Sequence, residues 1–232
     1  MNTQLTLGIS LRDDATFSNF YVGRNQQVLH ALGQLVAGQG ENIIYLWGLP
    51  GAGISHLLQA ACHEVFQHDG NAIYLNLSEQ QFTPDILQDL ETVDLICIDD
   101  IESILGQFDW EEALLHLYNR VKETGVRLII GAKELPKGLK CQLLDLKSRL
   151  AWGLVLKLHE LTNEEKLQAL QMRAVKRGLN LSENTQQFLL RCYPEDTVSL
   201  FDVLDKLDKA SLAEKRKLTV PFVRQGLGSL EE

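Results

Sequence analysis

The sequence predicts an α/β fold in which a parallel β-sheet covered by helices is followed by a smaller, all-helical domain. Up to about residue 160, short β-rich runs alternate with longer helical patterns, an order typical of a parallel sheet with helical connections. After Leu158 the strand-like runs cease and only helical patterns remain. The domain boundary is therefore expected near residue 160, and a chain of 232 residues can bury a substantial core.

Five apolar, β-rich runs are the expected strands: Ile43–Trp47, Ala72–Leu77, Asp94–Ile98, Arg127–Ile130 and Leu154–Leu158. Between the third and fourth runs, apolar residues at spacings of three and four predict a helix over Asp109–Thr124, which Gly125 ends.

The second domain is expected to hold four helices. Thr162 and Glu165 have the spacing of a capping box, which predicts a helix that continues to Arg177. Two further helices are expected over Ser182–Cys192 and Asp196–Leu212, and a fourth begins at Thr219, just before a proline.

A glycine-rich loop follows the first strand and precedes a helical pattern. Residues 48–55 read Gly-Leu-Pro-Gly-Ala-Gly-Ile-Ser, which matches the phosphate-binding pattern G-x-x-x-x-G-K-[ST] except that Ile54 replaces the lysine. In such loops backbone N–H groups hold phosphate oxygens, so they can bind without the lysine. The alternative is an ordinary glycine-rich turn. The expected nucleotide-binding residues are Gly48, Gly51, Ala52, Gly53, Ile54, Ser55 and His56.

Two carboxylates, Asp99 and Asp100, come directly after the third apolar run. In phosphate-loop proteins an acid at this point organises Mg²⁺, and the next acid can polarise a water molecule. The competing interpretation is a buried strand with an acidic exit turn, because Asp favours turns. The glycine loop favours the functional interpretation, and both acids join the expected nucleotide site.

Arg149 lies shortly before the last strand and allows two interpretations. It can form an i,i+4 ion pair with Asp145 on one helical turn, which is worth only about 0.3–0.5 kcal/mol. It can also serve as an arginine finger, a planar cation offered to the γ-phosphate of a neighbouring molecule's nucleotide. The spacing alone does not separate these interpretations.

The composition limits the partners. A formal net charge of −9 repels nucleic-acid phosphates, so we expect no direct specific DNA binding. The chain has no apolar run long enough to span a membrane, and its N-terminus lacks the pattern of a secretory signal. The four cysteines are far apart in the sequence and form no metal-ligand or redox motif, so a reduced, cytoplasmic location is expected.

Several segments, in their order and spacing, resemble the DnaA family of AAA+ P-loop proteins and, more closely, its shorter regulatory members, the Hda-like proteins. The segments are FSNFYVG (17–23), LICIDDIE (95–102), LYNR (117–120), SRLAWG (148–153), EKLQALQ (165–171) and RKLTVPFV (216–223). The resemblance covers nearly the whole chain. It implies an AAA+ core over residues 15–160 and a helical lid over residues 161–232.

The resemblance also implies a function. Hda-like proteins act with the DNA-loaded sliding clamp of the replicative polymerase and stimulate hydrolysis of ATP bound to DnaA, which turns initiation off. In that family a Gln-Leu-x-Leu segment docks on the clamp, so residues 1–14 become a clamp-binding segment in which Gln4, Leu5 and Leu7 make the contacts. Arg149 corresponds to the arginine finger, and Asn119 lies on a helix that faces partners.

Three groups that serve a protein's own bound ATP are missing. Ile54 replaces the loop lysine, the lid helix segment Thr197–Leu207 contains no arginine, and the tip Gly131-Ala132 lacks the polar sensor residue. We therefore expect negligible ATPase activity and, as the bound ligand, ADP or another nucleoside diphosphate. The sequence leaves open whether Mg²⁺ accompanies it and whether the chain forms a homodimer.

Two other functions fit the sequence less well. An autonomous P-loop ATPase, such as a helicase loader, needs a phosphate-contacting lysine where this chain has Ile54. A DnaA-like DNA-binding initiator needs a basic surface and C-terminal DNA-binding helices, and the acidic balance opposes it.

Overall fold

The computed structural model describes residues 11–79, 81–193, 197–214 and 218–228. The chain divides into two compact units, Met1–His159 and Glu160–Glu232. This division lies next to the boundary expected at residue 160. The expected clamp-binding residues Gln4, Leu5 and Leu7 lie outside the described residues.

The first unit is built on a five-stranded parallel sheet with the strand order β2-β3-β4-β1-β5. The strands are β1 (Ile43–Trp47), β2 (Ala72–Asn76), β3 (Leu95–Asp99), β4 (Arg127–Ala132) and β5 (Leu154–Lys157). All five expected strands are present: β1 has the expected bounds, and the other four have ends shifted by one or two residues. The shift matters in β3, because Asp99 is its last residue and not part of the turn after it.

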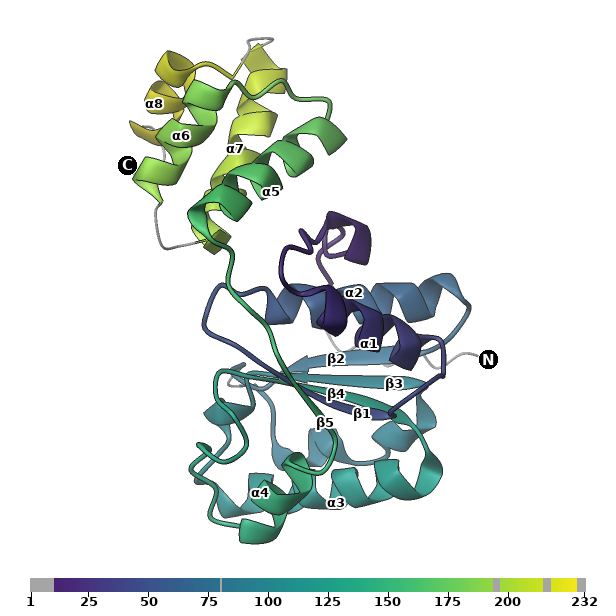
Figure 1. The fold of residues 1–232 in the computed structure, drawn as a ribbon. Helices are drawn as coiled ribbons and strands as arrows, with labels where there is room; N and C mark the ends of the chain where they lie inside the picture. The colour runs from purple at the N-terminus through teal and green to yellow at the C-terminus, as the bar shows by residue number, and fades with distance from the viewer. Residues whose placement is uncertain (1–10, 80, 194–196, 215–217, 229–232) are drawn as a thin grey trace. The chain divides into compact units, whose positions relative to one another are not determined.

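Helices cover both faces of this sheet (Figure 1). On one face lie α1 (Gln26–Val36) and α2 (Ile54–Gln67), and on the other lie α3 (Phe108–Thr124) and α4 (Leu144–Leu150). Each layer has its own apolar core, one including Leu32 and Leu58 and the other including Leu114 and Leu117. Every residue of β3 is buried, as expected for an interior strand of a parallel sheet covered on both faces. Short 3₁₀ turns complete the unit: Phe17–Asn19, Pro84–Leu87, Leu90–Thr92 and Ile101–Ser103.

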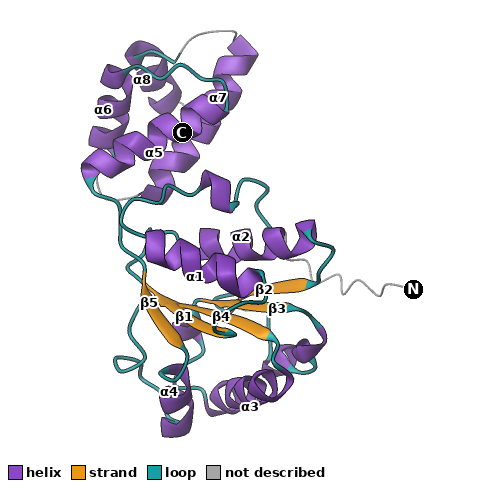
Figure 2. Ribbon diagram, turned by 45° about the vertical axis from the view of Figure 1, so that its right-hand side comes forward, coloured by secondary structure: helices purple, strands orange, loops and turns teal. Residues whose placement is uncertain are grey.

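The described residues of the second unit form helices joined by loops, with no strand among them (Figure 2). Its helices are α5 (Asn163–Lys176), α6 (Glu183–Cys192), α7 (Thr197–Glu214) and α8 (Val220–Gly228). The expected capping box is present at the start of α5: the Thr162 hydroxyl accepts the Glu165 N–H at 3.2 Å, and the Glu165 carboxylate accepts the Thr162 N–H at 2.8 Å. Leu170, Leu189 and Leu204 join the three longer helices in one core.

Two of the four cysteines lie next to each other in the fold. Cys62 and Cys97 are distant in the sequence but neighbours in the fold, since α2 packs on β3 and brings the two buried thiols close together. Burial raises the pKa of Cys97, and contact with Cys62 raises it further. Both are free and fully buried, so they act as packing residues. None of the helices in the described residues is both long enough and apolar enough to cross a membrane.

Candidate functional site

The glycine loop connects β1 to α2, and its backbone needs glycine at several positions. Gly51 and Gly53 have φ angles of 84° and 103°, a region that other residues rarely adopt. A Cβ atom on Gly53 would lie 2.9 Å from Cε2 of Phe20, and one on Gly48 would lie 2.6 Å from the Leu158 carbonyl oxygen. The loop therefore has the geometry expected from its sequence, with glycine required for both conformation and close approach.

The amino end of α2 is the part of this loop that can hold an anion. The N-cap residue is Gly53, which has no side chain to cap the helix. The first N–H groups of α2, from Ile54, Ser55 and His56, therefore lack an acceptor within the helix. These groups and the helix dipole favour a phosphate oxygen at this point.

Ile54 turns toward the sheet. A Cβ atom built on Gly131 of β4 would lie 2.7 Å from Cγ2 of Ile54 and 2.8 Å from Oδ1 of Asp99. Ile54 thus fills the space in which a side chain at position 131 would stand. Isoleucine at position 54 and glycine at position 131 therefore belong to one packing arrangement. This arrangement puts an apolar group beside Asp99.

Asp99 is almost fully buried at the end of β3, with 3% of its surface exposed. Its Oδ2 accepts the Tyr74 hydroxyl at 2.8 Å, its Oδ1 accepts the Asp100 N–H at 3.0 Å, and the Ser55 hydroxyl also hydrogen-bonds to the carboxylate. Burial raises the pKa of Asp99, although the hydrogen bonds from Ser55 and Tyr74 partly offset this effect. Protein donors thus occupy most of the acceptor positions of this carboxylate.

Asp100 has a partner of its own. Its φ of 54° turns the chain at the end of β3, and its Oδ1 lies 2.7 Å from Nζ of Lys133. The hydrogen bond to Asp100 raises the pKa of Lys133. Lys133 follows Ala132, whose carbonyl accepts the Gly48 N–H at 3.1 Å, so this lysine begins at the edge of the glycine loop.

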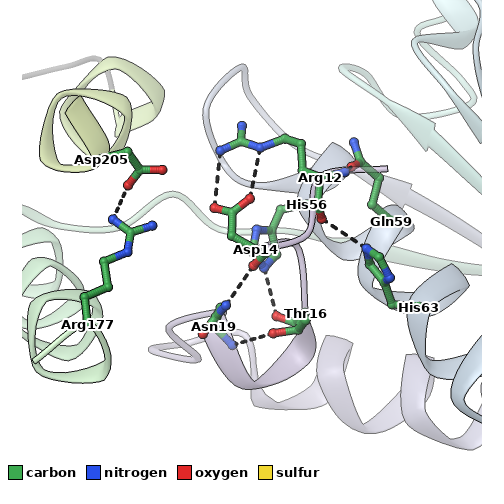
Figure 3. A network of polar contacts seen from close by, with 9 residues as sticks. All are labelled: Arg12, Asp14, Thr16, Asn19, His56, Gln59, His63, Arg177 and Asp205. Atoms are coloured by element: carbon green, nitrogen blue, oxygen red, sulfur yellow. Dashed lines mark hydrogen bonds and ion pairs between the residues drawn. The ribbon is translucent and has the colours of Figure 1, made fainter. Parts of the chain in front are cut away.

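The His56 side chain contacts the N-terminal segment and does not face the loop. Its Nε2 donates to the Thr16 carbonyl at 2.9 Å, so its ring faces the N-terminal segment and only its backbone N–H remains with the loop (Figure 3). Further along α2, Gln59 Oε1 accepts the Arg12 N–H at 2.9 Å and His63 Nε2 donates to the Arg12 carbonyl at 3.0 Å. These three α2 side chains fasten residues 12–16 along the helix. The sequence analysis missed Gln59 and His63, whose signal was their shared helical face.

Arg149 lies on α4 and combines two contacts. Its Nε lies 3.4 Å from Oδ1 of Asp145, so the ion pair expected from the sequence is present. Its guanidinium carbon lies 4.5 Å from the ring centre of Trp152, and Nζ of Lys122 lies 4.6 Å from the same ring. Trp152 is 59% exposed. The Arg149 Nε atom is itself buried and has no hydrogen-bond partner among the described residues.

A hollow of about 440 Å³ lies beside Trp152. It is lined by Gly40, Glu41, Asn42, Ile43, Tyr118, Val121, Lys122, Trp152 and Gly153. Asn119 is half-buried on α3, next in the chain to Tyr118. Burial raises the pKa of Tyr118, and the nearby charge of Arg149 partly offsets the shift.

The glycine-loop residues and the residues around Trp152 lie at opposite ends of the strands. These two ends are called here the glycine-loop edge and the Arg149 edge of the sheet. The hollow beside Trp152 is lined by residues that enter β1 and β5, whereas the glycine loop leaves β1 at its other end. The length of β1, about 15 Å, separates the two edges. The structure therefore brings together the loop, Asp99 and Asp100, and it places Arg149 elsewhere.

Helix α7 of the second unit contains no arginine. Instead Asp205 of α7 forms an ion pair with Arg177 at the end of α5, also drawn in Figure 3. Within the described residues, no group of three or more His, Cys, Asp or Glu side chains could hold a metal ion.

Known proteins share this architecture. Domain III of the replication initiation protein DnaA from Thermotoga maritima is 22% identical, with a TM-score of 0.79 over 95% of this chain and 98% of that one. AMPPCP-bound DnaA from Aquifex aeolicus is 23% identical, with a TM-score of 0.75 over 87% of this chain and 66% of that one. The RuvB branch migration motor of Thermotoga maritima is 16% identical, with a TM-score of 0.64 over 89% of this chain and 69% of that one.

Two family models together cover most of the chain. The bacterial DnaA ATPase domain matches residues 11–157, and the lid domain of Hda matches residues 163–227. These matches correspond to the two compact units. The chain therefore belongs to the DnaA-related family of AAA+ proteins and carries a lid of the Hda type.

Proposed function

We propose that this chain is a negative regulator of bacterial replication initiation that promotes hydrolysis of ATP bound to DnaA. Arg149 acts in trans as the arginine finger, and Asn119 contributes to the contact with DnaA. The observation that carries the proposal is the location of Arg149 at the edge of the sheet opposite to the chain's own glycine loop. From that position Arg149 serves a nucleotide on another molecule.

The surroundings of Arg149 suit this role. A guanidinium stacked on an aromatic ring is restricted in orientation while its outer N–H groups stay available for phosphate oxygens. The ion pair with Asp145 is partly exposed and therefore weak, so a phosphate can replace it. A finger of this kind is worth about 10³–10⁵ in hydrolysis rate.

The sliding clamp is the second proposed partner. Gln4, Leu5 and Leu7 dock on the DNA-loaded clamp as a short linear segment whose apolar side chains enter preformed pockets. Replacing Leu7 with Ala should remove a large share of the affinity, because a few buried anchors carry most of such binding energy. Unchanged clamp binding by a chain that lacks residues 1–10 would refute this assignment. This function belongs to the cytoplasm.

The proposed ligand of the glycine loop is ADP or another nucleoside diphosphate. The N–H groups at the amino end of α2 suit a β-phosphate, and DnaA relatives of the same fold bind the nucleotide analogue AMPPCP. Ile54 offers no charge to a γ-phosphate, and Asp100 is paired with Lys133. The chain's own ATPase activity is therefore negligible, since one lost charge-stabilising donor commonly costs about 10²–10³ in rate.

The test compares two rates under the same conditions. One is ATP turnover by the isolated chain, and the other is hydrolysis of ATP on purified DnaA in the presence of the chain and DNA-loaded clamp. The proposal predicts no measurable turnover alone and strong stimulation of DnaA. Turnover by the isolated chain at the rate of AAA+ motors, with no effect on DnaA, would identify an autonomous ATPase instead.

A further inference from the structure

The carboxylates after β3 stand where a phosphate-loop protein organises Mg²⁺, but their contacts do not fit the ion. A magnesium site needs one or two carboxylates that are free to bind the ion or its waters. Asp99 already accepts hydrogen bonds from Tyr74, Ser55 and the Asp100 N–H. Asp100 is 2.7 Å from the ammonium group of Lys133. Asp99 is thus buried with most of its acceptor positions used, and Asp100 is already paired with a cation, so neither carboxylate is freely available to a metal.

Lys133 supplies a positive charge at the same place. Its Nζ also lies within the field of Asp99 and Glu102, so several negative charges hold the ammonium at the end of β3. Its backbone is fixed as well, because Glu102 Oε1 accepts the N–H groups of Lys133 and Glu134. The side chain is about half exposed, so its ammonium group is accessible to a ligand.

We infer that Lys133 is the counter-charge for phosphate in this site, and that the glycine loop binds a nucleoside diphosphate without a divalent cation. The inference rests on the nucleotide binding proposed above and adds the residue and the metal independence. The Lys133 backbone adjoins the loop through the hydrogen bond between Ala132 and Gly48. One ammonium thus replaces both the missing loop lysine and the ion.

The geometry has a testable consequence for Asp100. Its carboxylate competes with the phosphate for Lys133 and adds a negative charge next to the ligand. In a magnesium site, loss of Asp100 weakens binding of the metal–nucleotide complex. In a site with Lys133 as the cation, loss of the Asp100 charge strengthens binding. Asp100→Asn separates these two cases, and Asn tolerates the positive φ at this position.

The experiment is calorimetric titration of the full-length chain with ADP, once in excess Mg²⁺ and once in EDTA. We expect equal affinities within about threefold. Lys133→Ala should weaken ADP binding about tenfold or more in both buffers, because a charge-assisted hydrogen bond is lost. Asp100→Asn should tighten binding in EDTA. The matched control is Lys137→Ala, an exposed lysine on the same segment, which should bind ADP like the wild type. Thermal unfolding checks that each variant is folded.

The other outcomes are distinct. Binding that requires Mg²⁺, and that Asp100→Asn weakens, would overturn the role of Lys133 and leave nucleotide binding in place. Equal affinities for the wild type and Lys133→Ala would overturn it as well. Absence of ADP binding in both buffers would overturn this inference together with the proposed ligand, whereas stimulation of DnaA by Arg149 is measured separately and would stand or fall on its own.

Discussion

Charged side chains have different surroundings at the two edges of the parallel sheet. At the glycine-loop edge, Asp99 is buried with its hydrogen bonds filled, Asp100 is paired with Lys133, and Ile54 puts an apolar group in the loop. At the other edge, Arg149 lies on an exposed tryptophan, and its Nε has no hydrogen-bond partner among the described residues. At the Arg149 edge the cation is supported mainly by an exposed ring, whereas at the glycine-loop edge the cation of Lys133 is already paired with Asp100.

The difference follows from what each contact costs. At the loop edge Asp99 is buried, and a buried charge must be satisfied by neighbours or it destabilises the fold. Once neighbours satisfy such a charge, few of its hydrogen-bonding positions remain for a ligand. The contacts of Arg149 are partly exposed, so each is worth about 1 kcal/mol or less and can be exchanged for a stronger one. A weakly held cation suits a role in an intermolecular site.

The largest expected effect tests the chemistry of the Arg149 edge. Arg149→Lys keeps the charge but loses the planar fork that contacts two phosphate oxygens. Stimulated hydrolysis of DnaA-bound ATP should fall to about a hundredth or less, while the fold and clamp binding remain unchanged. Single-turnover hydrolysis measures the rate, and circular dichroism is the control for folding. Full activity of the lysine variant would mean that only a positive charge is needed there.

A change at the loop edge tests the packing between Ile54 and Gly131. Gly131→Ala puts a Cβ atom 2.7 Å from Ile54 and 2.8 Å from Asp99, so it should cost about 1–3 kcal/mol of unfolding free energy. Ile54→Ala in the same chain should recover part of this loss. Urea unfolding of both single variants and the double variant gives the coupling free energy. Additive losses would show that these residues do not constrain each other.

A smaller, pH-dependent effect is expected at Asp99. Burial raises its pKa above the ordinary value of 3.8, so the native state holds this proton to higher pH than the unfolded state does. The contribution of Asp99 to stability is therefore present below about pH 4 and decreases as pH rises through the native pKa. The unfolding free energy of the wild type minus that of Asp99→Asn should fall over this range and then level off. A difference that grows with pH would contradict the sign of the shift.

The smallest effect is expected at Trp152. Because its ring is 59% exposed, Trp152→Ala should change the unfolding free energy by less than about 1 kcal/mol. It should still slow the stimulated hydrolysis several-fold, since Arg149 loses the surface that restricts its orientation. Trp152→Phe, which keeps a ring, should retain most of the rate. If the alanine variant matched the wild type, stacking would have no part in positioning Arg149.

Local signals in the sequence were enough to predict the strands, the glycine loop, the acidic pair and the capping box. Each depends on residues close together in the chain. The partners of those residues were not predictable in this way. Tyr74 meets Asp99 because β2 pairs with β3, and Lys133 meets Asp100 because β4 lies on the other side of β3. Strand order, which the sequence analysis did not determine, is what brings them together.

Contacts between distant segments were equally unpredictable at the sheet edge that holds Arg149. Arg149 and its neighbour Asp145 are one helical turn apart, so their ion pair could be predicted. The contact of Lys122 with Trp152 joins α3 to the segment after α4, and only the packing of α4 on α3 creates it. The ion pair of Arg149 is therefore confirmed, whereas its action as an arginine finger stays a prediction for the hydrolysis assay.

The central claim is that the chain acts through Arg149 on ATP held by DnaA. The most direct measurement loads DnaA with labelled ATP, adds the chain and DNA-loaded clamp, and follows one turnover. The wild type and Asp145→Ala should stimulate hydrolysis equally, because the ion pair costs less than about 1 kcal/mol to lose. Arg149→Ala should lower the stimulated rate by about 10³-fold or more while still folding and binding the clamp. Equal turnover with all three proteins would contradict the account, because Arg149 would then be a structural residue.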